Sequence, residues 1–315
     1  MDRYQLPKHG GLVKDAPKDI VQRYEKTPTR VFDSEYLGVQ YVADIICRMV
    51  NHHREESSAR DIYEEVPPFV LGITTGRTPL GLYRELVRRY EAGVISFSRV
   101  AVVSLDEFYP IKGSEHQSRN YRIHDDLLKH IDILPENIHI PDGTVPQEEI
   151  SEYCAKYDKL ASNIDLMIIG MGEQGQIGFN EPGSYAKSHT RLVELSHNSR
   201  KVQSSQFFGL ASTPKMAITM GIGTIMSADR IVLMAWGEEK AEAVHNVVEG
   251  SVNDLVPASN LQAHPNVEVV IDENAAQNLT REQTPWLVGP CVWTPKFVRK
   301  AVVWLCGVVN KPILK

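Results

Sequence analysis

Apolar residues in this chain gather in short unbroken runs, with amphipathic stretches between them. Runs of this length without polar alternation are typical of strands that are buried on both faces. Such strands separated by helices form mainly parallel sheets. We therefore predict an α/β fold of the doubly wound, Rossmann-like type, with helices on both faces of the sheet. The runs that predict its strands are residues 69–73, 100–105, 166–169, 231–236 and 267–271.

The stretches between the runs repeat apolar residues at helical spacing. Ser34 precedes such a pattern, since serine favours helix starts, and we expect polar residues 51–66 to end that helix. Thr78 and the proline after it open a second helix, because proline fits the first helical turn. Two more helices are expected near residues 118–130 and 238–247.

Changes of pattern near the two ends divide the chain into three parts. Residues 1–31 are polar and have no period, which predicts an N-terminal extension. Residues 32–275 carry the α/β pattern. Residues 276–315 hold three of the four tryptophans and a last helix. We expect a tryptophan-rich helical extension there that leads to a further domain.

Composition narrows the function classes. The formal net charge of −6 and the pI near 6.0 give no basic footprint for nucleic acid. No apolar run reaches the length of a membrane span, and the first residues carry no secretory h-region. We expect a cytoplasmic protein that uses no metal and binds neither nucleic acid nor membranes. No metal-type pair is formed by the scattered cysteines, Cys47, Cys154, Cys291 and Cys306.

A turn rich in glycine and threonine joins the first predicted strand to its helix at residues 71–79. Backbone N–H groups at such a helix start are free and lie at the positive end of the helix dipole, which suits a phosphate. Thr75 and Thr78 add hydroxyl donors, and Arg77 adds a charge. The turn lacks the Gly-Lys-Ser/Thr ending of a Walker loop. The alternative is an ordinary strand-to-helix turn with a capping threonine.

Two acidic residues, Asp106 and Glu107, follow the second predicted strand. Residues at the carboxyl ends of strands line the ligand crevice of open α/β sheets. A partly desolvated carboxylate there can accept a proton from a carbon next to a carbonyl. The alternative is an aspartate that only caps the following turn.

A glycine-rich segment follows the third predicted strand at residues 169–184. Its glycines do not form the dinucleotide-binding pattern with its following helix. The run Phe179-Asn180-Glu181-Pro182 instead predicts a loop across the mouth of the sheet. A long connection without chemistry is the alternative, although loops of this length are usually functional.

These three segments, in this order, resemble the glucosamine-6-phosphate deaminase/isomerase family. The resemblance is carried by Leu-Asp-Glu-Phe-Tyr-Pro at 105–110 and Gly-Phe-Asn-Glu-Pro at 178–182, and it extends over residues 32–275. It implies that a sugar phosphate ring is opened and that a carboxylate moves a proton between C2 and C1. Ammonia then leaves and fructose 6-phosphate forms, without any cofactor. The resemblance also implies a homo-oligomer, usually a hexamer.

The resemblance assigns roles to single residues. Asp106 matches the proton-abstracting base, and Glu181 matches the glutamate that supports a ring-opening histidine. Lys215 matches a phosphate-binding lysine. The phosphate loop is expected at Thr74, Thr75, Gly76, Arg77 and Thr78.

Several positions depart from the family. Gln176 stands where the ring-opening histidine is expected, and Gln174 stands where its aspartate partner is expected. A glutamine amide forms hydrogen bonds but does not titrate near neutral pH. A phosphate-binding arginine is also missing near Gln206, and we expect Arg77 to supply that charge instead.

We expect an enzyme of the glucosamine-6-phosphate deaminase/isomerase type with an altered catalytic site. Its ligand would be a phosphorylated amino sugar or related hexose, and ring opening would be spontaneous or assisted by Glu181 or water. Two alternatives stay open. One is a non-catalytic sugar-phosphate-binding module that regulates a larger protein. The other is a different sugar-phosphate isomerase or a lactonase, although the two sequence motifs named above argue against it.

Overall fold

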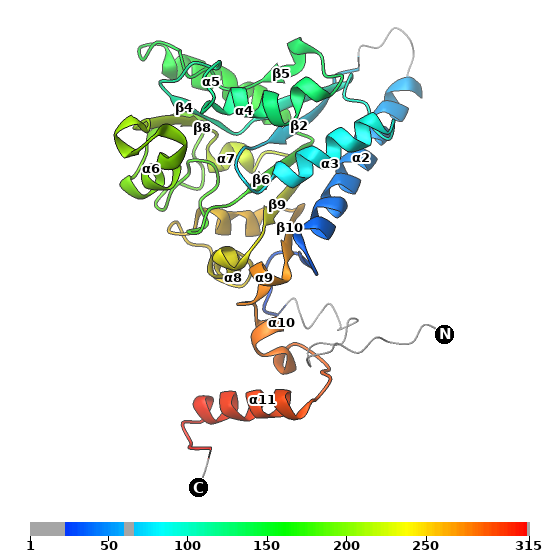
Figure 1. The fold of residues 1–315 in the computed structure, drawn as a ribbon, viewed down its shortest axis with the longest axis vertical. Helices are drawn as coiled ribbons and strands as arrows, with labels where there is room; N and C mark the ends of the chain where they lie inside the picture. Colours follow the sequence, from blue (N-terminus) through cyan, green and yellow to red (C-terminus); the bar gives the residue numbers. More distant parts are fainter. Residues whose placement is uncertain (1–22, 60–65, 314–315) are drawn as a thin grey trace.

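The main sheet is parallel throughout and has seven strands in the order β1-β10-β9-β6-β2-β3-β5. The computed structural model describes residues 23–59 and 66–313 of the chain (Figure 1). This sheet confirms the predicted α/β fold. Its strands are β1 (Thr29–Phe32), β2 (Phe69–Ile73), β3 (Val100–Ser104), β5 (Ile138–His139), β6 (Leu166–Gly170), β9 (Ile231–Ala235) and β10 (Val267–Asp272).

Helices cover both faces of the main sheet. On one face α2, α3 and α4 pack into a core that includes Val42 and Leu82. On the other face α5, α7 and α8 pack into a second core that includes Tyr157 and Val244. No helix in the described ranges is long and apolar enough to cross a membrane. The helices are α2 (Glu35–Ala59), α3 (Leu80–Glu91), α4 (Arg119–Asp126), α5 (Ile150–Leu160), α6 (His197–Gln203), α7 (Ile222–Ile225), α8 (Ala241–Val248), α9 (Glu273–Ala276), α10 (Thr280–Gln283) and α11 (Pro295–Val308).

A second, smaller sheet departs from the prediction of a single sheet. It has three antiparallel strands in the order β4-β8-β7, namely β4 (Asp106–Tyr109), β8 (Met216–Thr219) and β7 (Arg191–Glu194). The predicted strand 100–105 therefore ends at Ser104, and the chain changes sheets at Leu105. The N–H of Leu105 donates to the carbonyl of Ile73 in β2. The carbonyl of Leu105 accepts from the N–H of Met220, which follows β8. Asp106 thus lies at the junction of the two sheets.

The end of helix α2 and the position of strand β1 differ from the sequence-based expectations. Helix α2 continues to Ala59, so the polar residues from 51 onward do not end it. An exposed helix turn needs no apolar residue, which is why polarity misled the prediction. The N-terminal extension expected over residues 1–31 overlaps strand β1, which pairs with β10. The part of that extension in residues 1–22 lies outside the described residues.

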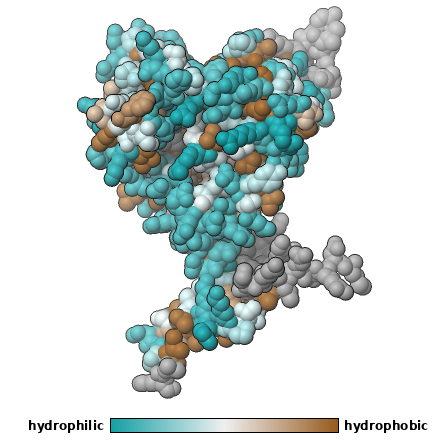
Figure 2. All heavy atoms as spheres, viewed as in Figure 1, coloured by the Kyte–Doolittle hydropathy of each residue, from teal (hydrophilic) through white to brown (hydrophobic). Residues whose placement is uncertain are grey.

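The tryptophan-rich part of the chain contains the predicted last helix, α11. The Trp286 ring lies 6.2 Å from the Trp293 ring, 5.3 Å from Phe297 and 5.7 Å from Trp304, measured between centroids. Figure 1 shows α11 beyond the foot of the α/β body, and Figure 2 shows apolar side chains gathered along it. The division into three domains stays a prediction.

Candidate active site

A cavity of about 810 Å³ lies at the carboxyl ends of the central strands. Its walls come from the segments that follow β2, β3, β6 and β9, and from α6 with the turn after it. The carboxyl ends of parallel strands meet at one edge of a sheet, where open α/β folds bind ligands. The three segments identified in the sequence therefore meet around one space.

The turn between β2 and α3 forms one end of this cavity through residues 74–78. The hydroxyl of Tyr83 donates a hydrogen bond to the carbonyl of Thr74. The indole N–H of Trp236 donates to the carbonyl of Thr78 over 3.1 Å. Side chains of the protein body therefore fix both ends of the turn.

The middle of the turn offers unused backbone donors. Gly76 has a φ of +109°, a conformation that glycine adopts without strain. Within residues 23–59 and 66–313, no hydrogen bond uses the N–H groups of Thr75, Gly76 and Arg77. Free N–H groups at the start of a helix form a ready site for an anion.

Two cations accompany these donors. Arg77 belongs to the turn, and Lys240 reaches the cavity from the segment after β9. Burial lowers the pKa of Lys240, and the nearby Arg77 charge lowers it further, whereas Glu173 and Glu239 oppose the shift. A bound anion beside Arg77 and Lys240 would offset the mutual repulsion of these two cations. No sequence pattern identified Lys240, although it follows β9 as the turn at residues 74–78 follows β2.

Lys215, the phosphate ligand expected from the resemblance, lies elsewhere. Its side chain is exposed and does not line the cavity. Its backbone carbonyl accepts a hydrogen bond from Leu195 over 2.8 Å, at the start of the β7–β8 pairing. The small sheet therefore fixes Lys215 at a position where its side chain points to solvent.

Also on the cavity wall, after β3, Asp106 faces Arg119. Their side chains are both buried, and Arg119 Nε lies 3.4 Å from Asp106 Oδ1. The pair lacks the geometry of a hydrogen bond, so it is held mainly by charge. The guanidinium also stacks on two rings, 4.6 Å from the centroid of Phe108 and 5.4 Å from that of Phe179. These rings orient Arg119 toward the carboxylate.

The surroundings of Asp106 favour its protonated form. Burial raises the pKa of the carboxyl, and the Arg119 charge partly offsets that shift. Gly178 passes so close that a Cβ on it would stand 3.0 Å from Asp106 Oδ2. A carboxylate with a raised pKa is a stronger base, so this one suits proton abstraction from carbon.

Glu107, unlike the adjacent Asp106, is fully engaged in structural hydrogen bonds. Its carboxylate accepts hydrogen bonds from the N–H groups of Phe108, Arg119 and Asn120 over 2.8 to 2.9 Å, and from the Ser118 hydroxyl over 2.7 Å. An anion at a helix start stabilises the free N–H groups there. Glu107 therefore holds the first turn of α4 in place, and that turn carries Arg119.

The two glutamines that replace the expected histidine and aspartate lie on the cavity wall. The side-chain carbonyl of Gln176 accepts a hydrogen bond from the backbone N–H of Gln174 over 2.9 Å. The backbone carbonyl of Gln176 accepts from Gly172, also over 2.9 Å. Gln176 thus folds back on its own loop, and its amide NH₂ and the second lone pair of its carbonyl oxygen are left for a ligand.

Asn180 anchors the loop that carries these glutamines. It is buried, and its amide donates to the carbonyls of Ile177 and Met220 over 3.0 and 2.7 Å. Its side-chain oxygen accepts from Arg191 over 3.0 Å. These bonds tie the loop to the small sheet, so the Asn-Glu-Pro motif serves the shape of the site.

Glu181, the next residue of that motif, does not line the cavity. Its carboxylate accepts hydrogen bonds from the backbone N–H and the hydroxyl of Ser196 over 3.1 to 3.2 Å. Ser196 caps α6 by accepting from Ser199. Glu181 therefore holds the start of the helix that forms one cavity wall.

Apart from the position near Gln206, the wall formed by α6 and the turn after it was not identified in the sequence. It is polar and has no cation at Gln206, as expected. Its residues follow no core strand, so no strand-end pattern marks them. They are Asn198, Ser199, Val202, Gln203, Ser205 and Gln206.

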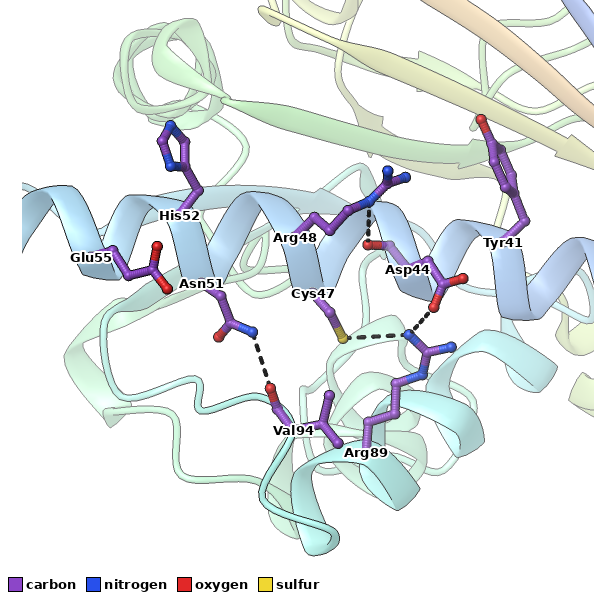
Figure 3. Close-up of a pocket in the computed structure, with 9 residues that line it drawn as sticks. All are labelled: Tyr41, Asp44, Cys47, Arg48, Asn51, His52, Glu55, Arg89 and Val94. Carbon is purple, nitrogen blue, oxygen red and sulfur yellow. Dashed lines mark hydrogen bonds and ion pairs between the residues drawn. The ribbon is translucent and has the colours of Figure 1, made fainter.

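A second hollow, of about 690 Å³, lies between α2 and α3 (Figure 3). Its buried cation, Arg89, donates to Glu85 and Asp44 over 2.6 Å and to Gln40 over 3.1 Å. The guanidinium also contacts Cys47. The Arg89 guanidinium is thus already paired with groups of the chain and is not free to bind an anionic ligand.

Comparison with known proteins identifies the family. The family model for glucosamine-6-phosphate isomerases and 6-phosphogluconolactonase matches residues 49–271. The chain belongs to this family. Glucosamine-6-phosphate deaminase 2 of Bacillus subtilis is 44% identical over 243 residues, which covers 73% of this chain and 96% of that protein. The predicted resemblance is therefore confirmed.

Other members of the family extend the comparison. A glucosamine-6-phosphate deaminase-like protein of Bacteroides thetaiotaomicron is 40% identical over 301 residues, which cover 95% of this chain. This chain spans only 44% of that relative's length. A solved monomeric glucosamine-6-phosphate deaminase has a TM-score of 0.72 at 34% identity and covers 80% of this chain and 100% of its own. The 6-phosphogluconolactonase of Thermotoga maritima shares the fold, with a TM-score of 0.57 at 19% identity. The match covers 78% of this chain and 100% of that protein's chain.

Proposed function

We propose that this chain acts as a deaminase/isomerase on a hexosamine 6-phosphate, converting it with water to a ketose 6-phosphate and ammonia. The cavity that joins a free phosphate-type turn to the buried Asp106 carboxylate carries this proposal. The names of the relatives support the same substrate class.

The phosphate would bind at the end of the cavity formed by the turn. The N–H groups of residues 75–77 donate to its oxygens, and Arg77 and Lys240 neutralise its charge. The sugar chain then extends along the cavity to Asp106. Binding of the phosphate, which does not react, would hold the reacting carbons in place, so that its binding energy contributes to catalysis.

Asp106 would move the proton. Its carboxylate takes the hydrogen from C2, beside the C1 aldehyde, and returns it to C1, while the aldehyde oxygen is protonated to a hydroxyl. C2 becomes an imine, which water hydrolyses to the ketone as ammonia leaves. Arg119 acts as a positioning residue that holds the carboxylate and limits its protonation.

Assembly and location complete the proposal. The family resemblance favours a homo-oligomer, usually a hexamer, in the cytoplasm, whereas one solved relative is described as monomeric. Sedimentation equilibrium distinguishes these states directly, because a hexamer has six times the mass of the 35.4 kDa chain.

The competing function is a sugar-phosphate-binding module without turnover, which the absence of a titrating group at Gln176 favours. Incubation with glucosamine 6-phosphate, with ammonia and fructose 6-phosphate measured together, separates the two. Equal amounts of both products support the deaminase. Binding of the substrate in calorimetry without either product supports the module, and hydrolysis of 6-phosphogluconolactone instead would indicate a lactonase.

A further inference from the structure

We propose that this site takes its amino-sugar phosphate in the open-chain form and leaves ring opening to water. The inference rests on the function proposed above and specifies which form of the substrate the cavity recognises. It follows from the groups that the structure places near the expected reacting carbons.

Opening a cyclic hexosamine requires two proton movements. The hydroxyl on C1 must lose a proton, and the ring oxygen must gain one as its bond to C1 breaks. A group that accelerates both steps has to accept and release a proton near neutral pH. None of the side chains that the structure places around the cavity is a histidine.

Gln176 cannot do this work. Its side-chain carbonyl accepts a hydrogen bond from the N–H of Gln174, and its amide NH₂ donates hydrogen bonds. These groups suit neutral hydroxyls of an extended chain. Neither titrates near neutral pH, so Gln176 can form a hydrogen bond with the C1 hydroxyl but cannot take its proton.

Glu181 is also unavailable. Its carboxylate is bonded to Ser196 at the start of α6 and lies outside the cavity lining. Because the Glu181 carboxylate already accepts from a backbone N–H and a hydroxyl, its role is to hold the start of α6 in place. Ring opening assisted by this residue, one of the options open from the sequence, has no geometry to support it.

The remaining carboxylates that line the cavity have neighbours other than Gln176. Glu173 and Glu239 interact electrostatically with Lys240. Glu35 stands beside the start of α3, with its Oε1 3.3 Å from where a Cβ on Gly81 would be. In the proposed binding mode these three groups face the phosphate, and Asp106 is the carboxylate placed against C2. Asp106 is needed for the C2 proton.

An enzyme that waits for spontaneous opening has a kinetic limit. Ammonia release should rise in proportion to enzyme at low concentration and then level off at the uncatalysed opening rate. That rate is measured in the same buffer by NMR exchange between the two anomers. The ring-opening step itself breaks the bond from C1 to the ring oxygen and needs no reagent except water.

The experiment therefore measures ammonia release from glucosamine 6-phosphate over a wide range of enzyme concentration. A plateau at the opening rate supports the inference. A rate that keeps rising beyond that limit overturns it and leaves the proposed deaminase function intact. No ammonia at any concentration rejects the proposed function, and the binding comparison described below then decides the inference by itself.

A double variant, Gln174→Asp with Gln176→His, tests the same point from the other side. It restores a titrating pair on the loop, so anomer exchange in its presence should accelerate by ~10²–10⁴ over the wild type. The plateau in ammonia release should then disappear. A wild-type protein that already accelerates anomer exchange to this extent would contradict the inference.

Binding gives a readout that does not need turnover. Two probes are compared by calorimetry: glucosaminitol 6-phosphate, the reduced open-chain form, and the ring-locked anhydro form of the same amino sugar phosphate. The open-chain probe should bind about tenfold or more tightly than the locked one. Equal or tighter binding of the ring-locked probe would overturn the inference, even if the protein is catalytically silent.

Discussion

Gly178 lies directly against the carboxylate of Asp106, since a Cβ on residue 178 would stand 3.0 Å from Oδ2. The same glycine has a φ of +56°, in the left-handed region that other residues adopt at a cost. The backbone therefore forms part of the wall around the proposed base. Any side chain at this position would push the carboxylate away from the reacting carbon.

Gly178→Ala should lower kcat by ~10²-fold, because a small displacement of a catalytic group costs about that much. Gly183→Ala is the matched control. Gly183 also has a positive φ, of +92°, but a Cβ there would meet no atom within 4 Å. Steady-state kinetics and thermal unfolding of both variants check this. Equal losses of activity in the two would show that backbone strain alone is responsible.

Arg119→Gln should shift the pH dependence of kcat/KM. Asp106 acts as a base only when it is deprotonated, burial raises its pKa, and the Arg119 charge opposes that rise. Removing the charge raises the pKa further, so activity should fall at a higher pH on acidification than in the wild type. The pH–rate profile of Arg122→Gln, on the exposed side of α4, should stay unchanged. An acid limb that does not move in Arg119→Gln would contradict the positioning role.

Arg77→Ala and Lys240→Ala should each raise KM by about 10- to 100-fold, the worth of a charged hydrogen bond. Both side chains line the phosphate end of the cavity, whereas Lys215 is exposed outside it. Lys215→Ala should therefore leave KM near the wild-type value. Initial rates over a range of substrate concentration, with competition by inorganic phosphate, provide the test. A large effect confined to Lys215→Ala would refute this assignment of the phosphate site.

Glu107→Ala should destabilise the fold by about 3 kcal/mol, because it leaves several buried donors without an acceptor. The donors are the N–H groups of Phe108, Arg119 and Asn120 and the Ser118 hydroxyl. Chemical denaturation measures the change. Glu115→Ala removes an exposed carboxylate that accepts only from Lys112, and it should change stability by no more than about 0.5 kcal/mol.

The sequence predicted five strands of the main sheet because they are buried on both faces and therefore read as unbroken apolar runs. The small sheet was missed for the opposite reason. Strand β4 contains two acidic residues, and β7 begins with Arg191. Strand β4 pairs with β8 across more than 100 residues of chain, from the pair Asp106 and Thr219 to the pair Tyr109 and Met216. No local pattern encodes such contacts. In the main sheet, strands β1 and β5 are only partly buried, and they were not predicted.

Part of the candidate site followed from the same logic. Parallel strands place their carboxyl ends together, so the turn at residues 74–78, Asp106 and the loop of Gln174 and Gln176 were expected to meet, and they line one cavity. Family resemblance extended the set to Glu181 and Lys215, whose side chains the structure directs elsewhere. Lys240 was missed because residues 238–247 were predicted only as a helix, and the two glutamates before Lys240 gave no sign of an anion site.

The central claim is that the buried Asp106 carboxylate transfers the proton on which deamination depends. Ammonia release from glucosamine 6-phosphate by Asp106→Asn, at an enzyme concentration where the wild-type rate is proportional to enzyme, tests it most directly. The variant should lose ~10²-fold or more of the rate and still bind inorganic phosphate, while Asp125→Asn on the exposed side of α4 keeps full activity. An Asp106→Asn protein that releases ammonia at the wild-type rate would contradict the account.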